Sequence, residues 1–121
     1  MKIAIAGFGV EGRANYKYFR HKFPDAQFII ADENPVEDLP DDVELRTGEN
    51  VFAGQLDDVD LVLRTPSIAP SRIETGGQVW SSTNEFFEQC PAPIIGVTGT
   101  KGKGTTCSLI ASILRASGQT V

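Results

Sequence analysis

The chain has 121 residues, 40% of them hydrophobic, which is enough to build one core of ordinary domain size. Its formal net charge of −5, without a basic stripe, argues against nucleic-acid binding, and no apolar run approaches the ~20 residues of a membrane span. The two cysteines, Cys90 and Cys107, form no CxxC pair, and the chain starts as a strand instead of a signal sequence. We therefore expect a cytoplasmic monomer with no nucleic-acid or membrane partner.

A glycine-rich turn follows the first predicted strand. Residues 2–6 are apolar and run directly into Gly7-Phe8-Gly9-Val10-Glu11-Gly12, after which residues 13–23 carry aromatic side chains at helical spacing. This is the G-x-G-x-x-G turn of a dinucleotide-binding fold in its usual context. A second strand, residues 27–31, ends in Asp32, and an acidic residue about 20 positions past the last glycine usually binds a ribose hydroxyl. The pattern predicts a nucleotide site.

Glu11 is unusual in such a turn, because its carboxylate would repel a pyrophosphate. Either its side chain points outward, or the ligand is held differently from a nicotinamide dinucleotide.

The middle of the chain predicts further strands around a loop that contains prolines. The run Leu61-Val62-Leu63 is typical of a strand covered on both faces. It leads into the proline loop of residues 65–70 at the C-terminal edge of the sheet, where open α/β sheets bind their ligands. The elements expected here are strands at residues 43–47, 60–64 and 78–81, an acidic solvated loop before the first of them, and helices at residues 50–55 and 83–89, the second capped by Ser82 or Thr83.

A phosphate-binding loop is the strongest motif. The apolar run of residues 93–97 predicts a strand, Gly99-Thr100-Lys101-Gly102-Lys103-Gly104-Thr105-Thr106 follows it, and residues 105–117 predict a helix with Gly118 as its C-cap. Glycines let backbone N–H groups turn toward an anion, the helix adds its positive end, and Lys103 can reach the outer phosphates. The loop predicts a nucleoside triphosphate site; a glycine-rich turn without a ligand is the alternative.

The metal ligand of this loop departs from the usual pattern. The residue after the lysine is usually Ser or Thr, whose hydroxyl holds Mg²⁺, but here it is Gly104. Thr105 or Thr106 would then supply the oxygen, with Gly104 giving the backbone room to bring it round.

These elements predict an α/β protein in two parts. Residues 1–90 should form a Rossmann-like, mostly parallel sheet with flanking helices, and residues 91–121 the first strand, phosphate loop and helix of a second α/β domain. Because residues 119–121 could start a further strand, we expect the N-terminal fragment of a longer protein.

Four segments resemble the Mur ligases, the ATP-dependent amide ligases of peptidoglycan synthesis, and the resemblance covers the whole chain. They are the Gly7–Gly12 turn, Arg64-Thr65-Pro66-Ser67-Ile68, Glu85-Phe86-Phe87, and the stretch from Pro93-Ile94-Ile95-Gly96-Val97-Thr98 through Lys103. In that family the first domain is Rossmann-like but holds the UDP of a sugar nucleotide. The resemblance implies that the UDP site is lined by the Gly7–Gly12 turn, Asp32, Glu33, Thr65, Pro66 and Ser67, with the backbone N–H of Glu11 facing the phosphate.

The resemblance also implies the reaction. The family members that this chain is most similar to add D-glutamate to UDP-N-acetylmuramoyl-L-alanine: ATP phosphorylates the substrate carboxylate, and the amine attacks the acyl phosphate. Residues 99–106 would bind ATP, with Lys103 as the catalytic cation and Thr105 as the Mg²⁺ ligand. The family's amino-acid-binding domain has no counterpart here, so these residues alone should be inactive.

Two other functions fit parts of the sequence. A nicotinamide-dependent oxidoreductase would use the glycine turn and Asp32 in the conventional way, but it leaves residues 99–106 without a role. A module that binds a nucleotide sugar without catalysis is the third hypothesis, and the length of the natural gene would distinguish it from a ligase.

Overall fold

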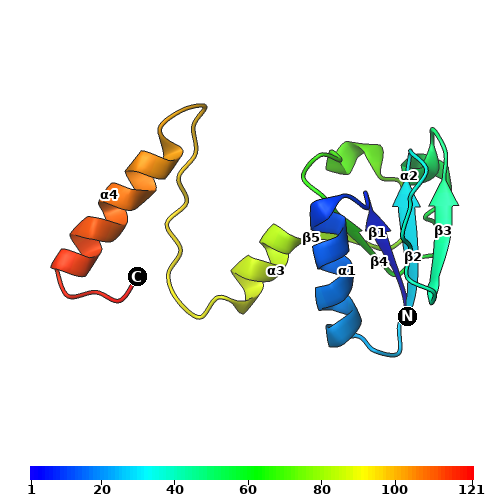
Figure 1. Ribbon diagram of the computed structural model, residues 1–121, viewed down its shortest axis with the longest axis horizontal. Helices are drawn as coiled ribbons and strands as arrows, with labels where there is room; N and C mark the ends of the chain where they lie inside the picture. Colours follow the sequence, from blue (N-terminus) through cyan, green and yellow to red (C-terminus); the bar gives the residue numbers. More distant parts are fainter. The chain divides into compact units, whose positions relative to one another are not determined.

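The structure, a computed structural model, describes residues 1–121. The chain divides into two compact units, Met1–Gln89 and Cys90–Val121, and each is described by itself (Figure 1). No helix in either unit combines the length and apolar character needed to cross a membrane.

A five-stranded sheet with every pair parallel forms the centre of the first unit. Its order is β3-β2-β1-β4-β5, so the first strand of the chain lies in the middle. The strands are β1 (Lys2–Ala6), β2 (Gln27–Asp32), β3 (Val43–Thr47), β4 (Leu61–Arg64) and β5 (Gln78–Ser81). The predicted Rossmann-like α/β fold is confirmed, and the sheet is wholly parallel.

The core lies on both faces of this sheet, because alternate side chains of a strand point to opposite faces. On one face Ile5 of β1 packs in a cluster with Phe19 of the helix α1 (Val10–Lys22). On the other face Ala4 packs with Val51 of the short helix α2 (Val51–Gly54). Burial on both faces explains why the inner strands are continuous apolar runs, whereas the edge strand β3 is largely exposed.

Several boundaries differ from the sequence predictions. Helix α1 begins at Val10, directly after its N-cap Gly9, so Gly12 lies inside the helix and not before it. A 3₁₀ turn that was not predicted, η1 (Pro70–Arg72), follows the proline loop, and Pro70 occupies its first turn. Helix α3 (Ser82–Gln89) follows β5 without a gap; its cap is Ser81, whose Oγ accepts a 3.2 Å hydrogen bond from the N–H of Asn84.

A buried carboxylate fastens α3 to the rest of the unit. Glu85 is 6% exposed and accepts hydrogen bonds from Lys22 Nζ at 2.5 Å, Tyr18 Oη at 2.9 Å and Trp80 Nε1 at 3.3 Å. Burial alone would raise the pKa of Glu85, but the hydrogen bonds from Lys22 and Tyr18 outweigh it and hold the pKa below its usual value. The contacts join α3 to α1 and to β5.

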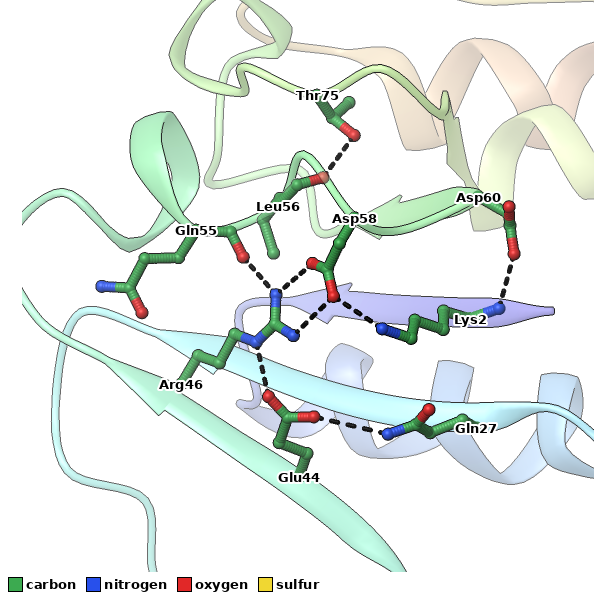
Figure 2. A network of polar contacts seen from close by, with 9 residues as sticks. All are labelled: Lys2, Gln27, Glu44, Arg46, Gln55, Leu56, Asp58, Asp60 and Thr75. Carbon is green, nitrogen blue, oxygen red and sulfur yellow. Dashed lines mark hydrogen bonds and ion pairs between the residues drawn. The ribbon is translucent and has the colours of Figure 1, made fainter.

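A second polar network joins β3 to the segment before β4 and to the start of β1 (Figure 2). Arg46 Nη1 lies 2.6 Å from Asp58 Oδ1, and Lys2 Nζ lies 2.8 Å from Asp58 Oδ2. Arg46 Nε also donates to Glu44 Oε1 at 2.7 Å. The hydrogen bonds from Arg46 and Lys2 hold the pKa of Asp58 well below its usual range. None of these residues lines the pocket described below, so the network is a structural brace for the edge strand.

The second unit contains one helix, α4 (Lys103–Ala116), which begins two residues earlier than predicted. Its C-terminus has the predicted glycine cap: Gly118 has φ +84°, its N–H bonds the carbonyl of Arg115 at 3.0 Å, and the N–H of Gln119 bonds that of Leu114 at 2.9 Å.

The predicted strand at residues 93–97 is wrong, because this segment forms no strand, and residues 119–121 form none either. A β-strand needs a neighbour for its backbone hydrogen bonds, and the unit Cys90–Val121 contains no strand to pair with.

Candidate functional site

A pocket of about 500 Å³ lies at the carboxyl ends of β1, β2 and β4. Open parallel sheets bind ligands at this edge. Segments far apart in the chain meet here: the glycine turn after β1, the residues after β2 and the proline loop after β4. The pocket is lined by Gly7, Gly9, Val10, Glu11, Asp32, Glu33, Asn34, Phe52, Thr65, Pro66, Ser67, Ile68 and Arg72.

The residues predicted for the UDP site all line this pocket except Phe8 and Gly12. The side chain of Phe8 is buried in the core and stays 4% exposed. Gly12 packs against the backbone of Gly7, because a Cβ on Gly12 would lie 2.0 Å from the carbonyl oxygen of Gly7. Both residues therefore support the glycine turn and do not line the pocket.

The glycine turn presents the start of α1 to the pocket. Gly7 has φ +85°, and its N–H donates to the carbonyl of Ala31 at 2.8 Å. The first helical hydrogen bond runs from the N–H of Arg13 to the carbonyl of Gly9 at 3.0 Å. The N–H groups of Val10, Glu11 and Gly12 therefore have no partner inside the helix, and they lie at its positive end. Such a helix start attracts phosphate.

Asp32 holds the turn in place. Its Oδ2 accepts the N–H of Phe8 at 2.8 Å, and its Oδ1 accepts the N–H of Asn34 at 3.0 Å. The carboxylate at the end of β2 thus links the first loop to the second. A carboxylate can accept more than two hydrogen bonds, so Asp32 retains capacity for a ligand hydroxyl.

The carboxylate of Glu11 has a partner outside the turn. Glu11 Oε1 accepts a 2.6 Å hydrogen bond from Ser82 Oγ, at the first residue of α3. Of the two alternatives that Glu11 left open, this contact favours an outward side chain, with the backbone of the turn free to face an anion.

The proline loop is held to β1 by Thr65, which is 6% exposed. Thr65 Oγ1 lies 3.3 Å from the carbonyl oxygen of Ala6 and 3.1 Å from Ser67 Oγ. Its position requires the glycine opposite, because a Cβ on Gly7 would lie 2.6 Å from Thr65 Oγ1. Pro66 and Ser67 are exposed on the pocket side.

Four lining residues were not anticipated from the sequence: Asn34, Phe52, Ile68 and Arg72. Phe52 comes from α2 and Arg72 from η1, neither of which belongs to a nucleotide motif. The only sequence feature that could have indicated these two residues is their position after β3 and β4, at the edge of the sheet where ligands bind.

The predicted phosphate-binding loop, residues 99–106, lies in the second unit. Gly99 has φ +151° and Gly102 has φ +78°, so these glycines adopt the backbone that side chains disfavour. Thr106 makes the first helical hydrogen bond, to Gly102 at 2.9 Å, which leaves the N–H groups of Lys103, Gly104 and Thr105 without a helical partner. Lys103 Nζ donates to the carbonyl of Gly99 at 2.5 Å, folding back over the loop.

The donors of this loop fit a triphosphate with Mg²⁺. The hydroxyls of Thr105 and Thr106 lie in the first turn of α4, and both residues are exposed. The chain holds no group of three or more His, Cys, Asp or Glu side chains that could bind a metal by themselves. In phosphate-binding loops a Ser or Thr hydroxyl holds Mg²⁺ together with substrate phosphates and waters. A Cβ on Gly104 would have no atom within 4 Å, so steric crowding does not explain why this position has glycine instead of the usual Ser or Thr.

Comparison with known proteins identifies relatives across nearly the whole chain, although no family model matches it. The chain is 31% identical to a UDP-N-acetylmuramoyl-L-alanine–L-glutamate ligase of Xanthomonas euvesicatoria and 32% identical to that of Xylella fastidiosa. It is 32% identical to a UDP-N-acetylmuramoylalanine–D-glutamate ligase of Clostridium botulinum. The alignments cover 96–97% of this chain and 28% of each relative, so the chain spans just over a quarter of their length.

These alignments run through all four segments on which the resemblance to the Mur ligases rests, and the fold beneath the first three is the Rossmann-like sheet described above. Nearly the whole chain is therefore homologous to part of these Mur ligases, which are named for joining glutamate to UDP-N-acetylmuramoylalanine.

Proposed function

We propose that the first unit binds the uridine diphosphate part of UDP-N-acetylmuramoyl-L-alanine, as the N-terminal part of an ATP-dependent ligase that adds D-glutamate. The observation that carries this proposal is the pocket of about 500 Å³ into which nine of the predicted UDP residues converge from three loops. The ligase names of the relatives support the reaction class.

The start of α1 suits the diphosphate. The N–H groups of Val10 and Glu11, which line the pocket and have no partner inside the helix, can donate to phosphate oxygens, and the helix dipole adds a favourable field. Because Ser82 holds the carboxylate of Glu11, that negative charge has a partner of its own. The ribose would then lie toward Asp32, whose carboxylate already fixes the turn.

The second unit is proposed to bind ATP and Mg²⁺ through residues 99–106. ATP supplies the phosphoryl group that activates the substrate carboxylate for attack by an amine. Lys103 must leave the carbonyl of Gly99 to reach a phosphate, and its charge then offsets that of the transferring group. Thr105 is the proposed Mg²⁺ ligand, with Thr106 as the neighbouring alternative.

The amino acid is proposed from the relatives and from the resemblance. Each relative cited above is named for glutamate, in the L form for Xanthomonas and Xylella and in the D form for Clostridium. We propose D-glutamate, as in the clostridial proteins. A ligation assay of the whole enzyme with D-glutamate and with L-glutamate tests this choice, and ligation of L-glutamate alone would contradict it.

Calorimetric titration of the 121-residue chain tests the nucleotide assignment directly. UDP-N-acetylmuramoyl-L-alanine, UDP and NAD⁺ are titrated in parallel under one salt concentration. We expect heat of binding for the two uridine compounds and none for NAD⁺. Binding of NAD⁺ alone would favour the oxidoreductase alternative. The absence of any heat of binding for the uridine compounds would contradict the proposal.

A further inference from the structure

Arg72 is the one basic residue that lines the pocket of the first unit, where the acidic residues Glu11, Asp32 and Glu33 also lie. The 3₁₀ turn η1 carries it, and its Nη2 forms an ion pair with Glu33 Oε1. The guanidinium carbon lies 5.7 Å from the centroid of the Phe52 ring. Arg72 is therefore fixed from two directions, by a carboxylate and by an aromatic ring.

The order of groups around the pocket places this pair relative to a bound nucleotide. The free N–H groups at the start of α1 attract the phosphates, and the acid at the end of β2, Asp32, lies on the ribose side. Glu33 directly follows Asp32 in the chain, and its partner Arg72 belongs to η1, after β4. A nucleotide that follows this order reaches Arg72 and Glu33 with its base.

The chemistry of the pair matches the edge of a pyrimidine. Arg72 offers N–H donors in one plane, and Glu33 offers carboxylate acceptors beside them. Uracil presents an N–H donor flanked by carbonyl acceptors, so one group of the pair can accept from the ring N–H while the other donates to the adjacent oxygen. We propose that Arg72, held against Glu33 and Phe52, binds the base of the nucleotide and sets its position in the pocket; this inference rests on the proposed function above.

The pair is accessible to a ligand. The side chains of Arg72 and Glu33 are 48% and 33% exposed, so a base can approach them without a large rearrangement. A phosphate contact would be the competing role for a lone cation in an acidic pocket.

A comparison of three ligands separates these roles. UDP, UMP and uridine are titrated into the wild-type chain, Arg72→Ala, Arg72→Lys and the control Lys17→Ala, which changes an exposed side chain outside the pocket. If Arg72 binds the base, Arg72→Ala weakens all three ligands by the same factor, about tenfold. Arg72→Lys retains the charge but loses the planar donor set, so it should weaken them nearly as much. Lys17→Ala should match the wild type.

A loss that is large for UDP, smaller for UMP and absent for uridine would overturn the inference in favour of a phosphate contact. Unchanged affinity in Arg72→Ala, with a far-ultraviolet spectrum like that of the wild type, would overturn it outright. If the wild-type chain itself binds none of the three ligands, the proposed function fails, and this outcome is distinct from the other two.

Discussion

The N–H of Phe8 donates to Asp32 Oδ2 at 2.8 Å, and this contact fastens the glycine turn after β1 to the end of β2. The sequence pattern assigns Asp32 to a ribose hydroxyl, but its first task in the structure is to shape the turn. A hydrogen bond to a carboxylate is stronger than one between neutral groups. The geometry of the free N–H groups at α1 therefore depends on this carboxylate.

Asp32→Asn should weaken UDP binding about tenfold and lower the stability of the first unit by about 1–2 kcal/mol. The amide keeps one acceptor oxygen, but it replaces the second by a donor that faces the N–H of Phe8 or of Asn34. Calorimetry and thermal unfolding measure the two effects. Asp25→Asn, at an exposed turn outside the pocket, is the control and should change neither. Equal binding in both variants would contradict the role given to Asp32.

Gly12→Ala should destabilise the first unit by about 3 kcal/mol, because the new Cβ would lie 2.0 Å from the carbonyl oxygen of Gly7 and both atoms are fixed to the backbone. Helix α1 would have to move away from the turn. The matched variant Gly9→Ala meets nothing within 4 Å and should leave the melting temperature nearly unchanged. Thermal unfolding compares the two, and an equal effect of both would show that the close approach at Gly12 is wrong.

Glu85→Gln should destabilise the first unit by about 1–2 kcal/mol at neutral pH, because it removes the buried charge that pairs with the partly exposed Lys22. The pKa of Glu85 is lowered in the folded state, so its stabilising contribution is present above the unfolded pKa and is lost as the pH falls through the folded pKa. The difference from the wild type should therefore shrink on acidification.

Urea unfolding at a series of pH values measures this dependence. Glu88→Gln, on the same helix but exposed, should show no such trend. A wild-type advantage that stays constant into the acid range would contradict the linkage.

Lys103→Ala should weaken ATP binding by this chain at least about tenfold and abolish ligation in a full-length enzyme, while UDP binding stays intact. The two sites belong to different compact units, Met1–Gln89 and Cys90–Val121. Binding of a fluorescent ATP analogue reports the first effect. Thr105→Val and Thr106→Val, compared with and without Mg²⁺, identify the metal ligand. Ligation that survives in Lys103→Ala would remove Lys103 from the mechanism.

The sheet could be predicted from the sequence because its inner strands are covered on both faces. A short apolar run such as Leu61-Val62-Leu63, with a charged residue at each end, is typical of a buried strand, and the glycine turn indicated the Rossmann-like class. Most of the pocket followed from the same rule, since loops at the carboxyl ends of parallel strands converge. The prediction of a strand at residues 93–97 was wrong because an apolar pattern is not sufficient for a strand. A strand also needs a neighbouring strand for its backbone hydrogen bonds, and the second unit has none.

Arg72 and Phe52 could not be predicted, because their roles depend on contacts across the fold. The Arg72–Glu33 pair joins residues 39 positions apart, and no local pattern signals it. The contact between Glu11 and Ser82 is of the same kind, with 71 positions between its partners. Local motifs predicted the backbone donors of the site, and tertiary packing decides which side chains stand beside them.

The most direct test of the proposed uridine diphosphate site is a titration of the ¹⁵N-labelled chain with UDP, followed residue by residue through the backbone amide signals. We predict that the shifted amides belong to Gly9, Val10, Glu11, Asp32 and Ser67, around the pocket of the first unit. The amides of residues 99–106 should stay in place at the same UDP concentration. Shifts confined to residues 99–106 would contradict the assignment of this pocket to the nucleotide sugar. The absence of any shift around the pocket of the first unit would contradict it as well.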